Sequence, residues 1–125
     1  MFEGLSSNDL AYIGDAVIEL YVRVFLVTAE HHSKKPSEEA VKYVSAASQS
    51  DALSRIESRL TEEETDIYKR ARNNYHTSNV PKSATPVQYR RSTGFEAVFG
   101  YLYLKGEHGR LAELFNIAYG LENKA

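Results

Sequence analysis

Cysteine is absent from the 125 residues of this chain. Its absence excludes a disulfide framework and any metal site built on thiolates, and it agrees with a reducing compartment. The first nine residues, MFEGLSSND, also lack the basic start and apolar run of a signal peptide. The longest nearly uncharged run, residues 95–104, is too short to span a bilayer. We therefore expect a cytoplasmic protein with no membrane partner.

The chain also lacks any alternation of apolar and polar residues long enough to require a β-sheet. Internal repeats and low-complexity segments are missing as well. The hydrophobic share of 42% and the charged share of 26% are those of an ordinary globular protein. A chain of this length is expected to form one domain with its own core, so we predict a single domain over residues 1–125.

Helical spacing of apolar residues and helix-capping signals are what the sequence does contain, and together they predict an all-α fold. Ser6 or Ser7 suits the N-cap of the first helix. Thr61 and Thr85 each stand three residues before Glu or Gln, which predicts a capping box at both. The expected helices cover residues 8–28, 36–47, 50–60, 61–72, 85–104 and 107–121.

Two of these helices are strongly apolar, and each contains one carboxylate near a glycine. Asp15 follows Gly14 within YIGDAVIELYV, and Glu96 lies two residues after Gly94, before AVFGYLYL. On the first helix we expect a stripe of apolar residues to face the core, although the opposite face is also largely apolar. Both acids are therefore expected to be buried. The expected stripe consists of Ile13, Val17, Leu20 and Val24.

Buried acids have few physical solutions. They can pair with Lys or Arg, share a proton, cap a helix, or hold a hard cation such as Mg²⁺ through their oxygens. For one such acid alone, an ion pair is the simpler interpretation. Two of them in one small helical domain, beside a basic segment, favour a divalent-metal site and metal-assisted phosphodiester cleavage. The arginines available for an ion pair are Arg23, Arg70, Arg72 and Arg90.

The basic segment runs from Lys69 to Arg91 and contains six Lys or Arg residues and no acid. The whole chain has a net charge of −2, so this segment stands out against an acidic background. Such a local field can hold a polyanion even in an acidic protein. The alternative is a basic loop that is simply solvated.

These segments resemble the ribonuclease III family. LAYIGDAVIELYV resembles the family's signature helix, and TGFEAVFGYLYLKG resembles its second catalytic helix. The segments YVSAASQSDAL, TEEETDIYKRARN and HTSNVPKSATPVQYRRSTGFEA are similar to the Mini-III branch, a ribonuclease III domain without a double-stranded RNA-binding domain. The resemblance extends from about Asp9 to Leu121, and with Ala125 as the last residue we expect no second RNA-binding domain.

The resemblance implies a helical endonuclease domain that forms a symmetric homodimer. It implies that Asp15 and Glu96 are catalytic and ligate Mg²⁺. The implied reaction is cleavage of double-stranded RNA to give 5′-phosphomonoester ends, and the implied substrate is a ribosomal RNA precursor in maturation of the 23S ends.

The chain departs from the longer family members at three positions where they have acids, which here are Asn8, Ala11 and Thr93. The number of metal ions per site therefore stays open. Asn8 and Thr93 are expected to orient metal-bound waters. Glu38 or Glu39 is a candidate for the family's remaining acidic position.

Contacts to RNA are expected from the basic segment, because double-stranded RNA is held mainly through phosphates and 2′-hydroxyls. Tyr12, Tyr101 and Tyr103 are expected in the core or an interface. Two other functions compete with the nuclease: a catalytically silent RNA-binding or ribosome-associated module, and a dimeric adaptor whose acids are structural. The RNA-binding candidates are Arg70, Arg72, Asn73, Lys82 and Arg90.

Overall fold

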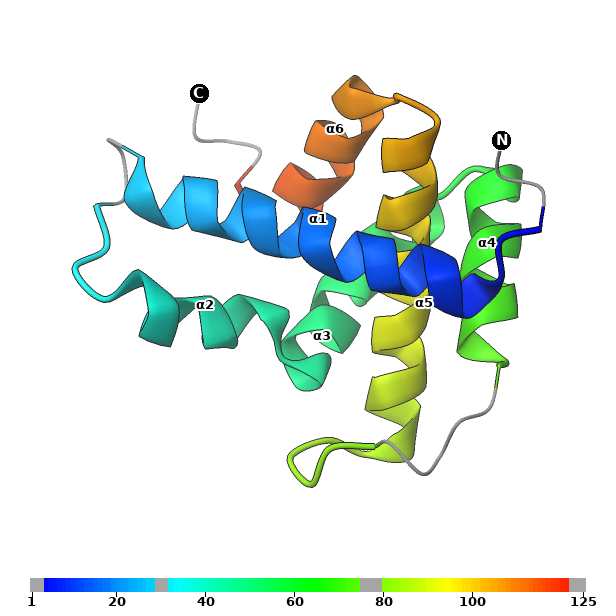
Figure 1. The fold of residues 1–125 in the computed structure, drawn as a ribbon, viewed down its shortest axis with the longest axis horizontal. Helices are drawn as coiled ribbons and strands as arrows, with labels where there is room; N and C mark the ends of the chain where they lie inside the picture. Colours follow the sequence, from blue (N-terminus) through cyan, green and yellow to red (C-terminus); the bar gives the residue numbers. More distant parts are fainter. Residues whose placement is uncertain (1–3, 29–31, 75–79, 122–125) are drawn as a thin grey trace.

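The fold is all-α, as the sequence predicts (Figure 1). The computed structural model describes residues 4–28, 32–74 and 80–121, and within these ranges it contains α-helices and one 3₁₀ turn but no strand. None of the helices in these ranges is both long and apolar enough to cross a membrane. The elements are α1 (Ser7–Val27), α2 (Pro36–Val44), α3 (Ala46–Ile56), η1 (Glu57–Arg59), α4 (Glu62–Arg72), α5 (Pro86–Leu104) and α6 (His108–Ala118).

Reciprocal capping boxes start α1, α4 and α5, and the three predicted starts are confirmed. Ser6 caps α1. The hydroxyl of Thr61 accepts from the backbone N–H of Glu64 at 3.1 Å, and the Glu64 carboxylate accepts from the Thr61 N–H at 2.8 Å. Thr85 and Gln88 form the same reciprocal pair, with both distances 3.0 Å. These bonds satisfy backbone donors that a helix start leaves unpaired.

The boundary between α2 and α3 differs from the prediction. Helix α2 ends at Val44 and α3 begins at Ala46, whereas the sequence led us to expect an end near residue 47 and a new start at residue 50. Ser45 causes the difference, since it is extended (ψ 155°) and its side chain accepts a hydrogen bond from the Ser48 N–H. A serine that caps the next helix in this way ends the preceding one. The last helix, α6, also ends earlier than expected, at Ala118.

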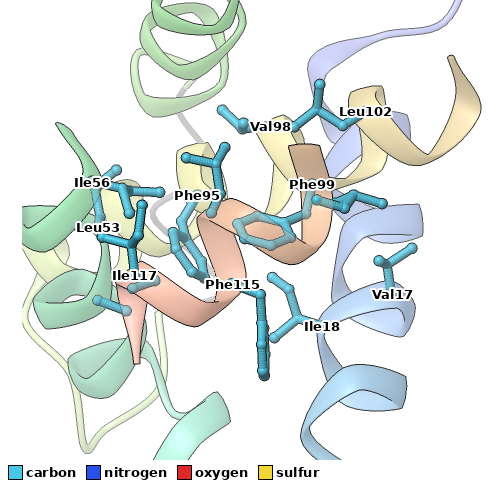
Figure 2. Close-up of a cluster of buried hydrophobic side chains, with 14 of the residues drawn as sticks. Val17, Ile18, Leu53, Ile56, Phe95, Val98, Phe99, Leu102, Phe115 and Ile117 are labelled. Carbon is cyan, nitrogen blue, oxygen red and sulfur yellow. The ribbon is translucent and has the colours of Figure 1, made fainter. Parts of the chain in front are cut away.

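Helix α5 is the central element, and the other long helices pack around it. It is buried on most sides, with Phe95 and Phe99 at its centre and their ring centroids 4.8 Å apart. Figure 2 shows these rings between Ile18 of α1 and Leu53 of α3. A helix that is apolar all round requires partners on every side, which explains its central position.

Helices α1 and α5 cross at glycines, which lets their backbones touch (Figure 1). A Cβ atom at Gly14 would overlap the backbone carbonyl of Glu96, and one at Gly100 would overlap the carbonyl of Leu10. Any larger residue at either position would force the two helices apart. The closeness of α1 and α5 is therefore a direct consequence of two missing side chains.

The expected core stripe of α1 is partly wrong. Leu20 and Val24 are 57% and 49% exposed, whereas Ile18, Val22 and Leu26 are fully buried. Since both faces of α1 are apolar, the helical period alone does not determine which face meets α5. We refer to the exposed large apolar residues of α1 and α2 together as the apolar face. Its members are Tyr12, Leu20, Val24, Val27 and Val41.

Candidate active site

The crossing of α1 and α5 brings Asp15 and Glu96 together. Gly14 lies against the backbone of Glu96, so the next residue on α1, Asp15, emerges beside the Glu96 side chain. Both carboxylates line one open cavity of about 430 Å³. The complete lining of this cavity is Asn8, Ala11, Tyr12, Asp15, Asn74, Tyr89, Thr93 and Glu96.

Asp15 is exposed, so the expectation that it is buried is wrong. Gly14 makes the contact with α5, and the next residue, Asp15, lies at the edge of the helix crossing and lines the cavity. Glu96, its partner in the cavity, is half-buried. Tyr12 lies outside the core, since 82% of it is exposed, and it lines the same cavity. Of the predicted core or interface position, only the interface is left.

The surroundings of Glu96 keep its carboxyl protonated at neutral pH. Burial, the negative charge of Asp15 and a hydrogen bond with Asp15 raise the pKa of Glu96 to about 9. The charge of Glu19 adds to this rise, while the amide of Gln49 opposes it. Two carboxyl groups that share a site in this way favour one proton, or a cation, between them.

No basic side chain neutralises this pair within the described ranges. The ion pairs found in these ranges include none between Asp15 or Glu96 and a Lys or Arg side chain. Arg23, one of the candidates, pairs with Glu19 at 3.2 Å instead. Arg72 donates to Asn73 at 3.1 Å. The charge of the two acids is therefore left for a proton or a bound cation.

The donor set suits a hard cation with few protein ligands. In the part of the chain that the structure describes, no group of three or more His, Cys, Asp or Glu side chains is arranged to hold a metal ion. The cavity instead offers two carboxylates and the side-chain oxygens of Asn8 and Thr93. Mg²⁺ is commonly held by one or two carboxylates and several waters, so these residues fit it.

Two of the other predicted site residues line the cavity and two do not. Asn8 and Thr93 both line it, and the Thr93 hydroxyl donates to the Tyr89 carbonyl at 3.0 Å. Glu38 and Glu39 belong to α2 and are absent from the lining. Glu39 accepts a hydrogen bond from Ser33 at 2.7 Å, which ties it to the segment before α2.

Sequence reasoning did not identify a buried polar pair behind Glu96. Gln49 of α3 is fully buried, and the Ser92 hydroxyl of α5 donates to its side-chain carbonyl. A signal was available in the sequence, because Gln49 precedes the buried residues Ala52, Leu53 and Ile56 at helical spacing and so occupies a core position. Asn74 and Tyr89 of the cavity lining were also missed, since neither carries a charge.

The predicted RNA contacts gather mainly at a second cavity. Its lining is Arg72, Asn73, Val87, Arg90 and Arg91. The Asp15 and Glu96 cavity adjoins it at the end of α4, where Asn73 lines one and Asn74 the other. Arg70 and Lys82 are exposed outside this lining. Residues 75–79 of the basic segment lie outside the described residues.

Arg91 is held in place by α3 and the 3₁₀ turn after it. Its guanidinium donates to the Ser50 hydroxyl at 2.9 Å and to the Ser54 hydroxyl at 2.6 Å, and it lies 3.5 Å from the Glu57 carboxylate. Because several acceptors hold its guanidinium, the Arg91 side chain has a fixed position on the basic surface. Arg91 lines the same cavity as Arg72 and Arg90.

Comparisons with known proteins agree on one family. A family model described as "Ribonuclease III domain" matches residues 8–107. A protein of Thermoanaerobacter sp. named "Mini-ribonuclease 3" is 43% identical over 115 residues, which cover 91% of this chain and 80% of that protein. The protein of the same name from Streptococcus pneumoniae is 48% identical over 109 residues, covering 84% of each.

A solved structure agrees with the sequence relatives. The crystal structure of a Fusobacterium nucleatum protein superimposes on this chain with a TM-score of 0.84 and 28% identity, covering 95% of each chain. The fold and the sequence relationship therefore extend over nearly the whole chain.

Proposed function

The chain belongs to the ribonuclease III family, within its Mini-ribonuclease 3 branch, and on this basis we propose that it is a Mg²⁺-dependent endonuclease of double-stranded RNA. Membership makes it a ribonuclease III-type endoribonuclease. The metal, the duplex substrate and the biological target are our proposals. One observation supports the metal: Asp15 and Glu96 converge from two helices, and the described ranges show no ion pair between either acid and Lys or Arg. The duplex substrate and the biological target rest on the family relationship.

The two acids have different tasks in this proposal. Asp15 is exposed and charged, so it is the first group to meet a cation entering the cavity. Glu96 is half-buried and holds a proton at neutral pH, which it must release for its carboxylate to become a ligand. When bound, Mg²⁺ supplies the positive charge that makes a water nucleophilic near neutral pH and stabilises the leaving oxygen. Departure of the 3′ oxygen leaves a 5′-phosphomonoester end.

Asn8 and Thr93 assist by hydrogen bonding inside the cavity. They stand where longer relatives have acids, and they line the cavity without adding charge. An uncharged oxygen can orient a water that a cation holds. The site therefore has two charged ligands, which suits a small number of metal ions.

The RNA backbone binds over the basic cavity next to the two acids. Duplex RNA is recognised by shape and by contacts to phosphate and 2′-hydroxyl groups, which Arg, Lys and Asn side chains can make. Arg72, Asn73 and Arg90 line that cavity, and Arg70 and Lys82 extend the basic surface around it. The adjoining lining at Asn73 and Asn74 would let one RNA strand touch both cavities.

We propose that the protein forms a symmetric homodimer, and its exposed apolar side chains support this. Tyr12, Leu20 and Val24 are large, apolar and exposed on α1, and exposed apolar side chains of this size are typical of interaction surfaces. A second copy covering the apolar face would place two cavities on one duplex, one for each strand. The proposed substrate in the cytoplasm is a ribosomal RNA precursor, at the ends of the 23S RNA.

The proposal is tested by incubating the protein with duplex RNA over a range of Mg²⁺ and salt concentrations. The wild type should cut, Asp15→Asn should lose the activity, and the control Asp51→Asn should keep it, since Asp51 is exposed on α3 outside the cavity. A wild type that binds the RNA but leaves it intact would instead support the silent RNA-binding module. Equal cleavage by Asp15→Asn would refute the assignment of the site.

A further inference from the structure

Gln49 lies directly behind Glu96 and belongs to none of the groups that the family resemblance assigns. It comes from α3, is fully buried, and meets α5 at Ser92. Ser92 and Glu96 are four residues apart on α5, so they lie on the same face of that helix. The Gln49 amide thus faces Ser92 at one end and the Glu96 carboxyl at the other.

The hydrogen bonding of this amide is only half complete. Its carbonyl oxygen accepts from the Ser92 hydroxyl. Its nitrogen, Nε2, is buried and has no hydrogen-bond partner of ordinary geometry in the part of the chain that the structure describes. A buried amide nitrogen without an acceptor is costly, so this arrangement calls for an explanation.

The Glu96 carboxyl group is the acceptor available to Nε2, because the Gln49 amide faces it from outside the cavity lining. A carboxyl group has two oxygens. One can face the cavity, and the other can accept from Gln49 Nε2. The Glu96 carboxyl group determines the direction of the amide, because a reversed amide would turn its oxygen toward the carboxyl oxygens. The Ser92 hydroxyl, which can donate or accept, donates to the amide oxygen at the other end.

We infer that Gln49, held at its other end by Ser92, is a positioning residue that orients the Glu96 carboxyl group for binding a divalent cation. The inference rests on the proposed function, because it assigns a role around the same metal site. It adds a donor from α3 to a site otherwise lined by residues of α1 and α5 and by Asn74, which follows α4. It also explains why a polar side chain occupies a core position of α3.

The inference is tested by binding of Mn²⁺, measured from the electron paramagnetic resonance signal of the free ion, without any RNA present. Gln49→Met keeps the length of the side chain and removes both polar ends. We expect it to bind Mn²⁺ roughly tenfold more weakly than the wild type, the scale of effect seen when a group that orients a metal ligand is lost. Ser92→Ala should weaken binding in the same direction, by less.

Leu53→Ala is the control for general destabilisation. Leu53 belongs to the same helix and is fully buried in the hydrophobic core, so its truncation loosens α3 without removing a donor to Glu96. It should bind Mn²⁺ like the wild type at a temperature where all variants are folded. In cleavage assays, Gln49→Met should lower kcat and leave the KM for RNA unchanged, because the RNA contacts lie elsewhere.

The outcomes separate this inference from the proposed function. A wild type that neither binds Mn²⁺ nor cuts RNA refutes the proposed function and this inference with it. A wild type that binds, with Gln49→Met equal to it or with Leu53→Ala weakened as much as Gln49→Met, refutes the role of Gln49 alone. If Gln49→Met does not fold, Ser92→Ala decides the question, and wild-type Mn²⁺ binding by that variant overturns the inference.

Discussion

Replacing Glu96 by Gln should make the metal-free protein more stable, although it removes a proposed ligand. The pKa of Glu96 is about 9 in the folded protein, and an unfolded glutamate has a pKa of about 4.5. At pH 7 the unfolded chain therefore gains free energy by releasing a proton that the folded protein keeps. Gln resembles the protonated carboxyl in shape and has no proton to release.

The size of the effect follows from the difference between the two pKa values. Over the interval from 4.5 to 7 the cost accumulates at 1.36 kcal/mol per pH unit, which gives about 3 kcal/mol as an upper bound at pH 7. We expect a gain of about 1–3 kcal/mol in the free energy of unfolding for Glu96→Gln. Because folding raises the pKa of Glu96, the wild type has its highest free energy of unfolding, relative to Glu96→Gln, below about pH 4.5. It loses this relative stability as the pH rises toward 9.

Urea denaturation at fixed protein concentration measures this difference, with a chelator present and at several pH values between 5 and 9. A fixed concentration is needed because dimer formation would contribute to the apparent stability. Asp51→Asn is the control, since Asp51 is exposed on α3 and lies outside the cavity. Added Mg²⁺ should stabilise the wild type and have little effect on Glu96→Gln. The reasoning is refuted if Glu96→Gln is the less stable protein at pH 7 without a divalent cation, or if the difference does not grow with pH.

Three further predictions concern the crossing, a buried ion pair and the basic cavity. Gly14→Ala should lower the free energy of unfolding by at least about 2 kcal/mol, since its Cβ would overlap the Glu96 carbonyl, and wild-type stability in urea would contradict the close crossing. Arg110→Met should cost about 3–5 kcal/mol in the same assay, because it leaves the buried Glu64 carboxylate without the guanidinium that donates to it at 2.8 and 2.9 Å. A loss below 1 kcal/mol would show that Glu64 is adequately solvated without Arg110. Arg72→Gln should weaken binding of duplex RNA and reduce the salt dependence of log K by about one, and an unchanged slope in a titration would place the phosphate contact elsewhere.

Local chemistry explains why so much of the secondary structure was predictable. The capping boxes at Thr61 and Thr85 involve residues three apart, so their hydrogen bonds can be inferred without knowing the rest of the fold. The break at Ser45 was missed because serine competes between a helix interior and a cap, and the surrounding Val44-Ser-Ala-Ala sequence suits either.

The candidate site was only partly predictable for a different reason. Asp15 and Glu96 were identified as acids in apolar helices, but their exposure depends on the angle at which α1 crosses α5. The residues Asn74 and Tyr89 carry no charge and belong to no motif, so only the folded chain brings them into the cavity. Glu38 and Glu39 had the right chemistry, but α2 keeps them out of the cavity lining.

The sequence by itself therefore determined that this protein is helical, where most helices begin, and which two carboxylates stand beside glycine in apolar segments. These features depend on neighbours within a few positions along the chain, where capping and helical spacing act. Only the tertiary structure decided that Gly14 and Gly100 let two backbones touch, that Asp15 opens into a cavity, and that Gln49 lies behind Glu96. Those facts depend on packing between residues more than 40 positions apart, and the two apolar faces of α1 left that packing open.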